Sequence, residues 1–197
     1  MITFADWKDS ILAGIAISIG CIAYLATGYA WLFPIGLFIV CYYRLSLFTG
    51  KVCYVTRLGE AGKMAFVYLW NTLAAWFMGF MMQYVRPEYV EKAGQMVSKK
   101  MALGFKIIPL AILCNIMIFV AVDTYKSTDR FLGLIFATTI FVACGFEHCI
   151  ANAFYFGLAG ADMFTIPGGW TFLIGNAVFN AVGGIGAKRL MGYPYRL

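Results

Sequence analysis

Long apolar runs separated by short polar segments are the dominant pattern of the chain. With a window of about 19 residues, the runs lie roughly at 11–29, 31–49, 64–84, 101–122, 131–156 and 170–186. Each run is long enough to cross a hydrocarbon core of about 30 Å. Transmembrane β-strands are shorter and alternate in polarity. The pattern therefore predicts an all-α membrane protein with six transmembrane helices, forming a single transmembrane domain over residues 1–197.

The composition agrees with a lipid environment. Hydrophobic residues make up 62% of the chain and charged residues 12%, against roughly 45–50% and about 25% in soluble domains. The first ten residues are mixed in polarity, and the run that follows is itself long enough to span a membrane, so no cleavable signal is expected. The cysteines form no CxxC motif and are expected to be buried free thiols; they are Cys21, Cys41, Cys53, Cys114, Cys144 and Cys149.

The basic residues of the loops predict the orientation in the membrane. Six crossings put both termini on one side, and that side carries Lys8, Lys51, Arg57, Lys63, Lys126, Arg130, Lys188, Arg189 and Arg196. The opposite side carries fewer: Arg86, Lys92, Lys99 and Lys100. The positive-inside rule then predicts a multi-pass protein of the cell membrane with both termini in the cytoplasm. Because topology accounts for the net charge of +6, no nucleic-acid partner is expected.

A weak internal repeat relates the two halves of the chain. Asn71 in the third apolar run and Asn176 in the sixth stand at comparable places, each followed by small residues. Halves of three spans each have opposite orientation, as in an inverted repeat whose site lies where two interrupted helices meet near midplane. The second and fifth runs, which contain polar residues near their ends, are the candidates for interruption. Small residues in membrane helices can equally be plain packing positions. Between the halves, the polar stretch 85–100 can form a short, charged surface helix.

The segment FVACGFEHCIAN, residues 141–152, is the most informative for chemistry. It places Gly145, Glu147, His148 and Asn152 inside an apolar run. Ionisable groups at that depth are costly and usually face a cavity or a partner. His148 can donate a hydrogen bond to an anion, and its proton is mobile near neutral pH; the alternative is a histidine that only satisfies its own hydrogen bonds in the core.

The same segment argues against catalysis and metal binding. A catalytic zinc site needs three converging ligands, and His148 is the single histidine of the chain. The sequence contains no Walker, GxSxG or HExxH motif. We therefore expect no enzyme activity, metal or cofactor.

Two further segments carry polar residues within apolar runs. In LSLFTGK, residues 45–51, Thr49 and Gly50 allow a membrane helix to unwind, although a simple helix C-terminus with its glycine would look the same. Asn115 is a lone amide in the fourth run, where an interhelical hydrogen bond is the plainest role.

Taken together, these segments resemble the formate/nitrite transporter family, which includes formate, nitrite and hydrosulfide channels. The specific element is GFEHCIAN (145–152), similar to that family's GFEH-x-x-AN signature. LFTG (47–50), LCN (113–115) and GN (175–176) accompany it in the expected order. The resemblance implies a homopentamer with one pore in each protomer. It also implies an aquaporin-like fold of inverted three-helix repeats with interrupted second and fifth helices.

The resemblance also implies roles for individual residues. His148 corresponds to the central pore histidine and Thr49 to the threonine that faces it. Glu147, Asn152 and Asn115 correspond to residues that support the histidine loop. Lys99 corresponds to a lysine that draws anions toward the pore. The remaining pore residues fall into two constrictions: Phe141 in one, and Leu47, Leu37 and Phe33 in the other.

The chain departs from the family pattern around LFTG. Ser46 stands where an acidic or small residue is usual, Lys51 replaces the usual asparagine, and Arg44 adds a charge. Arg44 can hold an anion near the pore or face a neighbouring subunit, so these departures bear on which anion is carried.

The functional expectation is a channel in the lipid bilayer for small monovalent weak-acid anions such as formate, nitrite, hydrosulfide, acetate or lactate. Passage is expected to be assisted by a proton at His148. Two alternatives remain: a channel for neutral small solutes of similar build, and a membrane-embedded enzyme or assembly factor in which His148 acts with a partner chain.

Overall fold

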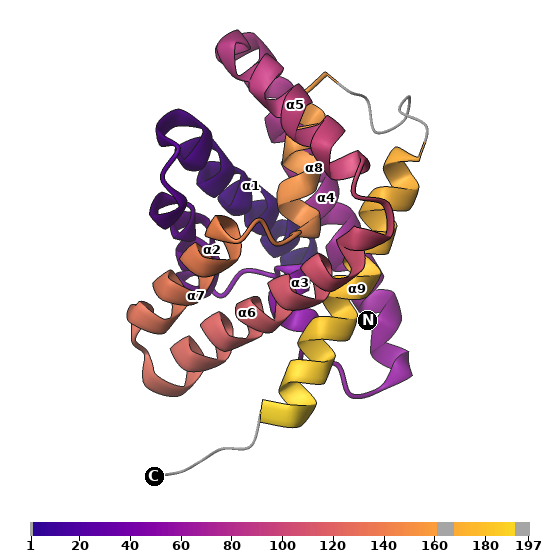
Figure 1. Ribbon diagram of the computed structural model, residues 1–197. Coiled ribbons are helices and arrows are strands. Elements are labelled where there is room, and N and C mark those ends of the chain that lie inside the picture. The colour runs from indigo at the N-terminus through magenta and orange to yellow at the C-terminus, as the bar shows by residue number, and fades with distance from the viewer. Residues whose placement is uncertain (1, 161–167, 192–197) are drawn as a thin grey trace.

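The computed structural model describes residues 2–160 and 168–191, and within them the chain forms helices and loops without a β-strand. Figure 1 shows the arrangement. The α-helices are α1 (Phe4–Thr27), α2 (Pro34–Tyr42), α3 (Phe48–Val52), α4 (Ala61–Val85), α5 (Val90–Met101), α6 (Ile107–Thr128), α7 (Phe131–Ala143), α8 (Cys149–Leu158) and α9 (Gly169–Met191). Short 3-10 helices are η1 (Ala30–Leu32), η2 (Leu58–Glu60), η3 (Pro87–Tyr89) and η4 (Gly104–Lys106).

Several of these helices have the length and hydropathy of membrane spans. They are α1, α4, α9 and the continuous helical stretch Gly104–Thr128 that contains α6. The helices α2, α7 and α8 are apolar but shorter. They derive from the second and fifth apolar runs, which do not form single continuous helices.

Helix boundaries differ from the sequence prediction where local capping decides them. α1 begins at Phe4 rather than near residue 11, because Thr3 and Asp6 form a reciprocal capping box at its start. α6 begins at Ile107 rather than near residue 101, because Gly104 (φ 52°) separates it from α5. As a result the stretch predicted as a surface helix is realised as α5, whose Ala93 and Val97 are buried against the body.

Both interruptions occur at a residue in the left-handed region of the backbone. Arg44 (φ 55°) lies between α2 and α3, and Gly145 (φ 66°) lies between α7 and α8. The first interruption therefore precedes LFTG, and Thr49 and Gly50 lie in the first turn of α3. This corrects the interpretation of Gly50 as the end of a helix.

Hydrogen bonds in the two interruptions repeat at a constant spacing along the chain. Each interruption turns a backbone N–H back onto the preceding helix and sends the next N–H to another helix. The matching pairs are Leu45 N to Val40 O (2.9 Å) with Phe146 N to Phe141 O (3.0 Å), and Ser46 N to Asp9 O (3.2 Å) with Glu147 N to Leu110 O (3.2 Å). The two halves of the chain thus build the same local structure twice.

An asparagine from a neighbouring helix holds each interruption. Asn71 of α4 accepts from Phe48 N (2.7 Å) and donates to the carbonyls of Ser10 and Ser46. In the second half Asn180 of α9 makes the three equivalent bonds. The predicted partner of Asn71, Asn176, lies one helical turn earlier.

Asn180 accepts from Cys149 N (3.0 Å) and donates to the carbonyls of Ala111 (2.7 Å) and Glu147 (2.9 Å). The amide of Asn176 is fully buried but makes no hydrogen bond with the described residues. The match of Asn71 with Asn176 was therefore wrong by one turn.

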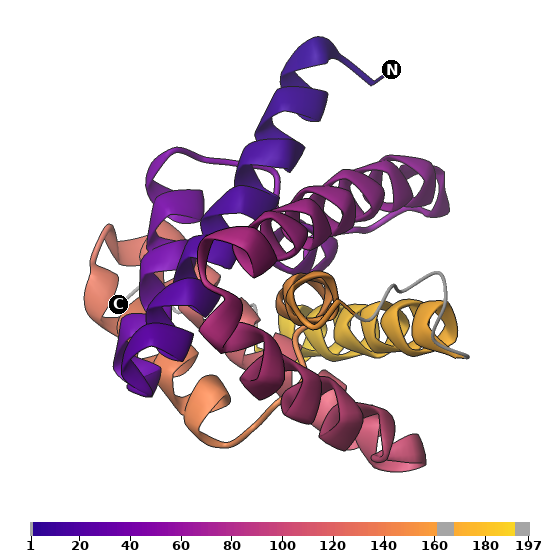
Figure 2. The ribbon, with the colours of Figure 1, turned by 90° about the horizontal axis from the view of Figure 1, so that it is seen from above.

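Helix α8, which follows the second interruption, lies at the centre of the molecule. In Figure 1 it runs beside α4, and Figure 2 shows it end-on between α4 and α9. Every residue of α8 is buried. Close approach to α4 depends on two glycines: a Cβ at Gly79 would meet the Phe154 carbonyl, and a Cβ at Gly157 would meet the Trp76 carbonyl.

Candidate functional site

The two interruptions meet at a contact between Thr49 and His148. The Thr49 hydroxyl lies 2.9 Å from His148 Nε2, and both residues are buried. Thr49 lies in the first turn of α3, and His148 is the N-cap residue of α8. The repeated interruptions therefore bring together two polar side chains that are far apart in the sequence.

The hydrogen bonds of His148 define its tautomer. Nδ1 accepts from the backbone N–H of Ala151 (3.2 Å), as an N-cap side chain does. A neutral imidazole that accepts at Nδ1 carries its hydrogen on Nε2. Nε2–H is therefore the donor to Thr49 Oγ1, and the hydroxyl hydrogen of Thr49 is available for another acceptor.

Two aromatic rings cover His148 on one side. Phe141 stacks on the imidazole (centroids 5.9 Å apart, 24° between planes), and Phe33 meets Phe141 edge to face at 5.5 Å. All three line a cavity of about 110 Å³, which also includes Tyr24 and Lys100; we call it the histidine cavity. Phe33 thus groups with Phe141, whereas the sequence placed it in the other constriction with Leu37 and Leu47.

A buried ion pair supports the histidine loop. Both carboxylate oxygens of Glu147 accept from the Lys100 ammonium (2.8 and 2.7 Å), and Asn152 donates to one of them (2.8 Å). The side chain of Glu147 is 4% exposed and that of Lys100 16%. Removing one partner of such a pair is strongly destabilising, because it leaves the other charge buried and uncompensated.

The lysine at the histidine cavity is Lys100, whereas the sequence assigned that end to Lys99. Lys99 is exposed on α5. The signal that distinguishes them is the phase of α5. Ala93 and Val97 are its buried residues, and positions three or four residues apart share a face. Lys100 follows Val97 by three, so the buried stripe points Lys100 inward and leaves Lys99 outside.

Asn115 forms a hydrogen bond with Thr49, one of the two residues of the Thr49–His148 contact. Its amide donates to the Thr49 carbonyl (3.2 Å) and approaches Cys53 Sγ at 3.6 Å. The sequence assigned Asn115 to the histidine loop. That loop is instead held by Asn180, which sequence reasoning missed.

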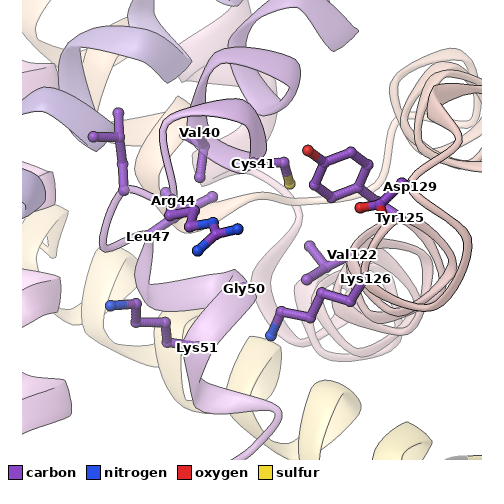
Figure 3. Close-up of a pocket in the computed structure, with 11 residues that line it drawn as sticks. Val40, Cys41, Arg44, Leu47, Gly50, Lys51, Val122, Tyr125, Lys126 and Asp129 are labelled. Carbon is purple, nitrogen blue, oxygen red and sulfur yellow. The ribbon is translucent and has the colours of Figure 1, made fainter.

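A second cavity, of about 360 Å³, lies on the other side of Thr49. It is lined by Leu47 and Gly50, which flank Thr49, and by Arg44, Lys51, Lys126 and Asp129 among others; we call it the basic cavity. Figure 3 shows Arg44 reaching from the interruption toward α6 and Lys126 reaching back from α6. Leu37 is buried in the core beside these residues and lines neither cavity.

The two cavities belong to opposite ends of the molecule. Ion pairs join Lys63 to Asp6 (2.7 Å) and Lys188 to Asp123 (3.8 Å). The first joins the start of α1 to the start of α4, and the second joins the end of α9 to α6. Figure 1 shows the start of α4 and the end of α9 at the same end of the molecule, which we call the terminal end. The basic cavity opens here, since Lys126 and Asp129 close α6. At the other end, Lys92 of α5 donates to the Leu25 carbonyl of α1, and α5 contributes Lys100 to the histidine cavity.

The donor set does not suggest a metal centre. Within residues 2–160 and 168–191, no group of three histidine, cysteine, aspartate or glutamate side chains converges in a way that could hold an ion. The cysteines of this part of the chain are free thiols, and of these Cys144 alone is exposed.

Comparison with known proteins agrees with this architecture. Residues 7–194 match the formate/nitrite transporter family, and the chain belongs to that family. It is 28% identical over 187 residues to an uncharacterized transporter, YrhG, of Bacillus subtilis, covering 84% of this chain and 69% of that protein.

Two formate channels match at higher identity over shorter segments. The formate channel FocA of Haemophilus influenzae is 48% identical over 54 residues, which is 25% of this chain and 19% of that one. The formate channel FocB of Escherichia coli is 43% identical over 51 residues, or 24% and 18%. Each match thus spans about a fifth of the channel's length.

Solved structures share the fold. An FNT family ion channel superposes with a TM-score of 0.82 at 20% identity, covering 95% of this chain and 90% of the other. A pentameric formate channel with formate bound superposes with a TM-score of 0.68 at 24% identity, covering 96% and 93%. This chain accordingly shares the fold of these solved structures, and its family is the one shown by the match over residues 7–194.

Proposed function

We propose that this protein is a channel for small monovalent weak-acid anions of the formate, nitrite, hydrosulfide, acetate or lactate class. The observation that carries the proposal is the Thr49–His148 contact. It is a hydrogen-bonding pair buried between two cavities, with Phe33 and Phe141 on one side and Leu47 on the other. The formate channels among the relatives support the same class of solute.

The physical problem for such a path is the cost of a bare charge among apolar side chains. A charge in low dielectric is expensive. His148 lowers this cost in either of two ways: it donates a hydrogen bond to the anion, or it passes a proton so that the neutral acid crosses the aromatic rings. α8 begins next to His148, so its positive end also favours an anion there.

Lys100 and Lys99 act at the outer approach in this proposal. Lys99 is exposed and raises the local concentration of anions. Lys100 is paired with Glu147, so it orients the loop more than it attracts charge.

The assembly proposed is a homopentamer with one path in each chain, embedded in the cell membrane with both termini in the cytoplasm. Six crossings with inverted halves account for the repeated hydrogen bonds of the two interruptions. The basic residues at the terminal end, including Lys63 and Lys188, favour the cytoplasmic orientation.

A channel for neutral small solutes is the second candidate, and the Lys100–Glu147 pair favours it. Because this pair is neutral overall, the histidine cavity holds no unbalanced cation. The neutral tautomer of His148 would then only orient an uncharged solute.

Uptake into liposomes separates the two candidates. The purified protein is reconstituted with an internal pH dye, and formate, nitrite, hydrosulfide, acetate and lactate are added in turn, followed by urea and glycerol with a light-scattering readout. Proton movement with the weak acids, absent from empty liposomes, supports the anion channel. Swelling with urea or glycerol without any proton movement would replace it with the neutral channel.

A further inference from the structure

We propose that Arg44 forms an anion site in the basic cavity and that this site selects planar anions with two oxygen atoms. It would favour carboxylates and nitrite over spherical anions such as hydrosulfide or chloride. This inference rests on the proposed channel function and specifies its substrate class. It comes from the backbone of Arg44, its lack of a side-chain partner among the described residues and the charges around it.

The backbone of Arg44 is the first observation. The same turn is built twice, once with Arg44 at φ 55° and once with Gly145 at φ 66°. Glycine adopts this region without penalty, whereas a residue with a Cβ is disfavoured there. The turn itself therefore does not require an arginine. An unfavourable backbone conformation retained beside a cavity points to a role for the side chain.

The second observation is that the guanidinium of Arg44 is uncommitted. Within residues 2–160 and 168–191, Arg44 makes no side-chain hydrogen bond or ion pair. The other two cations of the cavity are partly engaged: the Lys51 ammonium donates to Ser46 Oγ (2.7 Å), and that of Lys126 lies 3.7 Å from the centre of the Tyr54 ring. Arg44 thus keeps its donors for a ligand.

The third observation is the charge of the cavity. Arg44, Lys51 and Lys126 line it together with a single carboxylate, Asp129. Asp129 forms no ion pair with any of them within the described residues, and the balance is positive. In Figure 3 the guanidinium lies in the space between the interruption and α6, with Lys126 facing it across that space. An anion bound there would meet both groups.

Geometry then decides the kind of anion. A guanidinium presents parallel N–H donors that match two oxygens of a carboxylate or nitrite in a bidentate arrangement. A spherical anion meets these donors singly and gains less from their direction. Leu47 lines the same cavity beside Thr49, so an anion released from Arg44 toward the interior enters the path at the Thr49–His148 contact.

The test compares Arg44→Gly and Arg44→Lys with wild type. Arg44→Gly keeps the turn, since glycine fits φ 55°, and Arg44→Lys keeps the charge without the planar donors. Arg130→Gln is the matched control, because Arg130 is an exposed cation of the same end that does not line the cavity. Formate, nitrite and hydrosulfide fluxes are measured against concentration in liposomes. Formate binding to each purified protein is measured by calorimetry.

The expected result is a rise of about tenfold in the half-saturating formate and nitrite concentrations in Arg44→Gly, as for loss of a charged hydrogen bond. Hydrosulfide should change by about twofold or less, since it lacks the bidentate contact. The half-saturating formate and nitrite concentrations of Arg44→Lys should lie between those of wild type and Arg44→Gly, and those of Arg130→Gln should match wild type. Formate binding should weaken in parallel.

Three results would overturn the proposal: equal changes for all three anions, no change in any, or dissociation of the assembly by Arg44→Gly, which would place Arg44 between subunits. The binding measurement separates this inference from the channel function. If formate binding depends on Arg44 but no flux is measured, the anion site is supported and the channel function is contradicted. If flux is measured but formate binding does not depend on Arg44, the channel function is supported and the anion site is contradicted.

Discussion

At the scale of single residues, the hydrogen bond between Thr49 and His148 links the two halves of the chain. Nε2–H needs an acceptor, and Thr49 supplies it at 2.9 Å. Thr49→Ala removes that acceptor, whereas Thr49→Ser retains it. We expect anion flux to fall about tenfold or more in Thr49→Ala, as when a buried donor is left without its acceptor, and to stay within about twofold in Thr49→Ser. Stopped-flow uptake of formate measures this, and equal flux in the two variants would contradict it.

The Lys100–Glu147 pair is the second feature at this scale. Lys100→Met leaves the buried Glu147 carboxylate without its cation, which is expected to cost about 3 kcal/mol. Lys99→Met is the control, because Lys99 is the neighbouring lysine and is exposed. Thermal unfolding in detergent should show a lower Tm for Lys100→Met and little change for Lys99→Met. If the double variant Lys100→Met with Glu147→Gln recovers none of the loss in Tm, the unpaired Glu147 carboxylate is not the cause of that loss.

At the scale of elements, each interruption is fixed by one asparagine of a neighbouring helix. Asn180 makes three hydrogen bonds, while Asn176, one turn away, is equally buried and makes none with the described residues. Asn180→Ala should destabilise the protein by about 2–3 kcal/mol, because it leaves buried backbone groups unpaired. Asn176→Ala should be close to neutral, since its amide makes no hydrogen bond with the described residues that the substitution would remove. Chemical denaturation of the two variants measures this difference. Equal losses in the free energy of unfolding would contradict the assignment of Asn180 as the asparagine that holds the second interruption.

The crossing of α4 with α8 is the other feature at this scale. A Cβ at Gly79 would meet the Phe154 backbone, so Gly79→Ala should separate the helices and destabilise them by about 1–3 kcal/mol, as overpacking does. Gly62 in the same helix has open space around it. Gly62→Ala should therefore stabilise α4 by about 0.5–1 kcal/mol through helix propensity. A comparison of Tm values tests both, and a tolerated Gly79→Ala would argue against the close crossing.

At the scale of the whole molecule, hydropathy and two motifs predicted the class of fold and the family. The apolar runs predicted an all-helical membrane protein, and α1, α4, α9 and Gly104–Thr128 have the length and hydropathy of membrane spans. GFEHCIAN with LFTG predicted the family, which the match over residues 7–194 confirms. What the sequence did not resolve was how individual helix residues pack. The distinction between Lys99 and Lys100 depends on which face of α5 turns inward. Asn176 and Asn180 share a buried face of α9, and they differ in which backbone groups lie within reach of the amide.

The position of each interruption was a second limit. LFTG looked like the end of a helix, but the backbone turns earlier, at Arg44, because Asn71 from a distant helix captures Phe48 N–H and starts α3. Such long-range hydrogen bonds leave no local mark in the sequence. The grouping of Phe33 with Phe141 is likewise a tertiary contact.

In the function that we propose, a small weak-acid anion crosses through the Thr49–His148 contact with help from the histidine proton. The most direct measurement is formate uptake into liposomes at a series of pH values across the neutral range, with wild type and His148→Ala side by side. We predict that flux through wild type rises as the pH falls, and that His148→Ala loses both most of the flux and its pH dependence. Flux through wild type that is independent of pH, or equal in His148→Ala, would contradict the account.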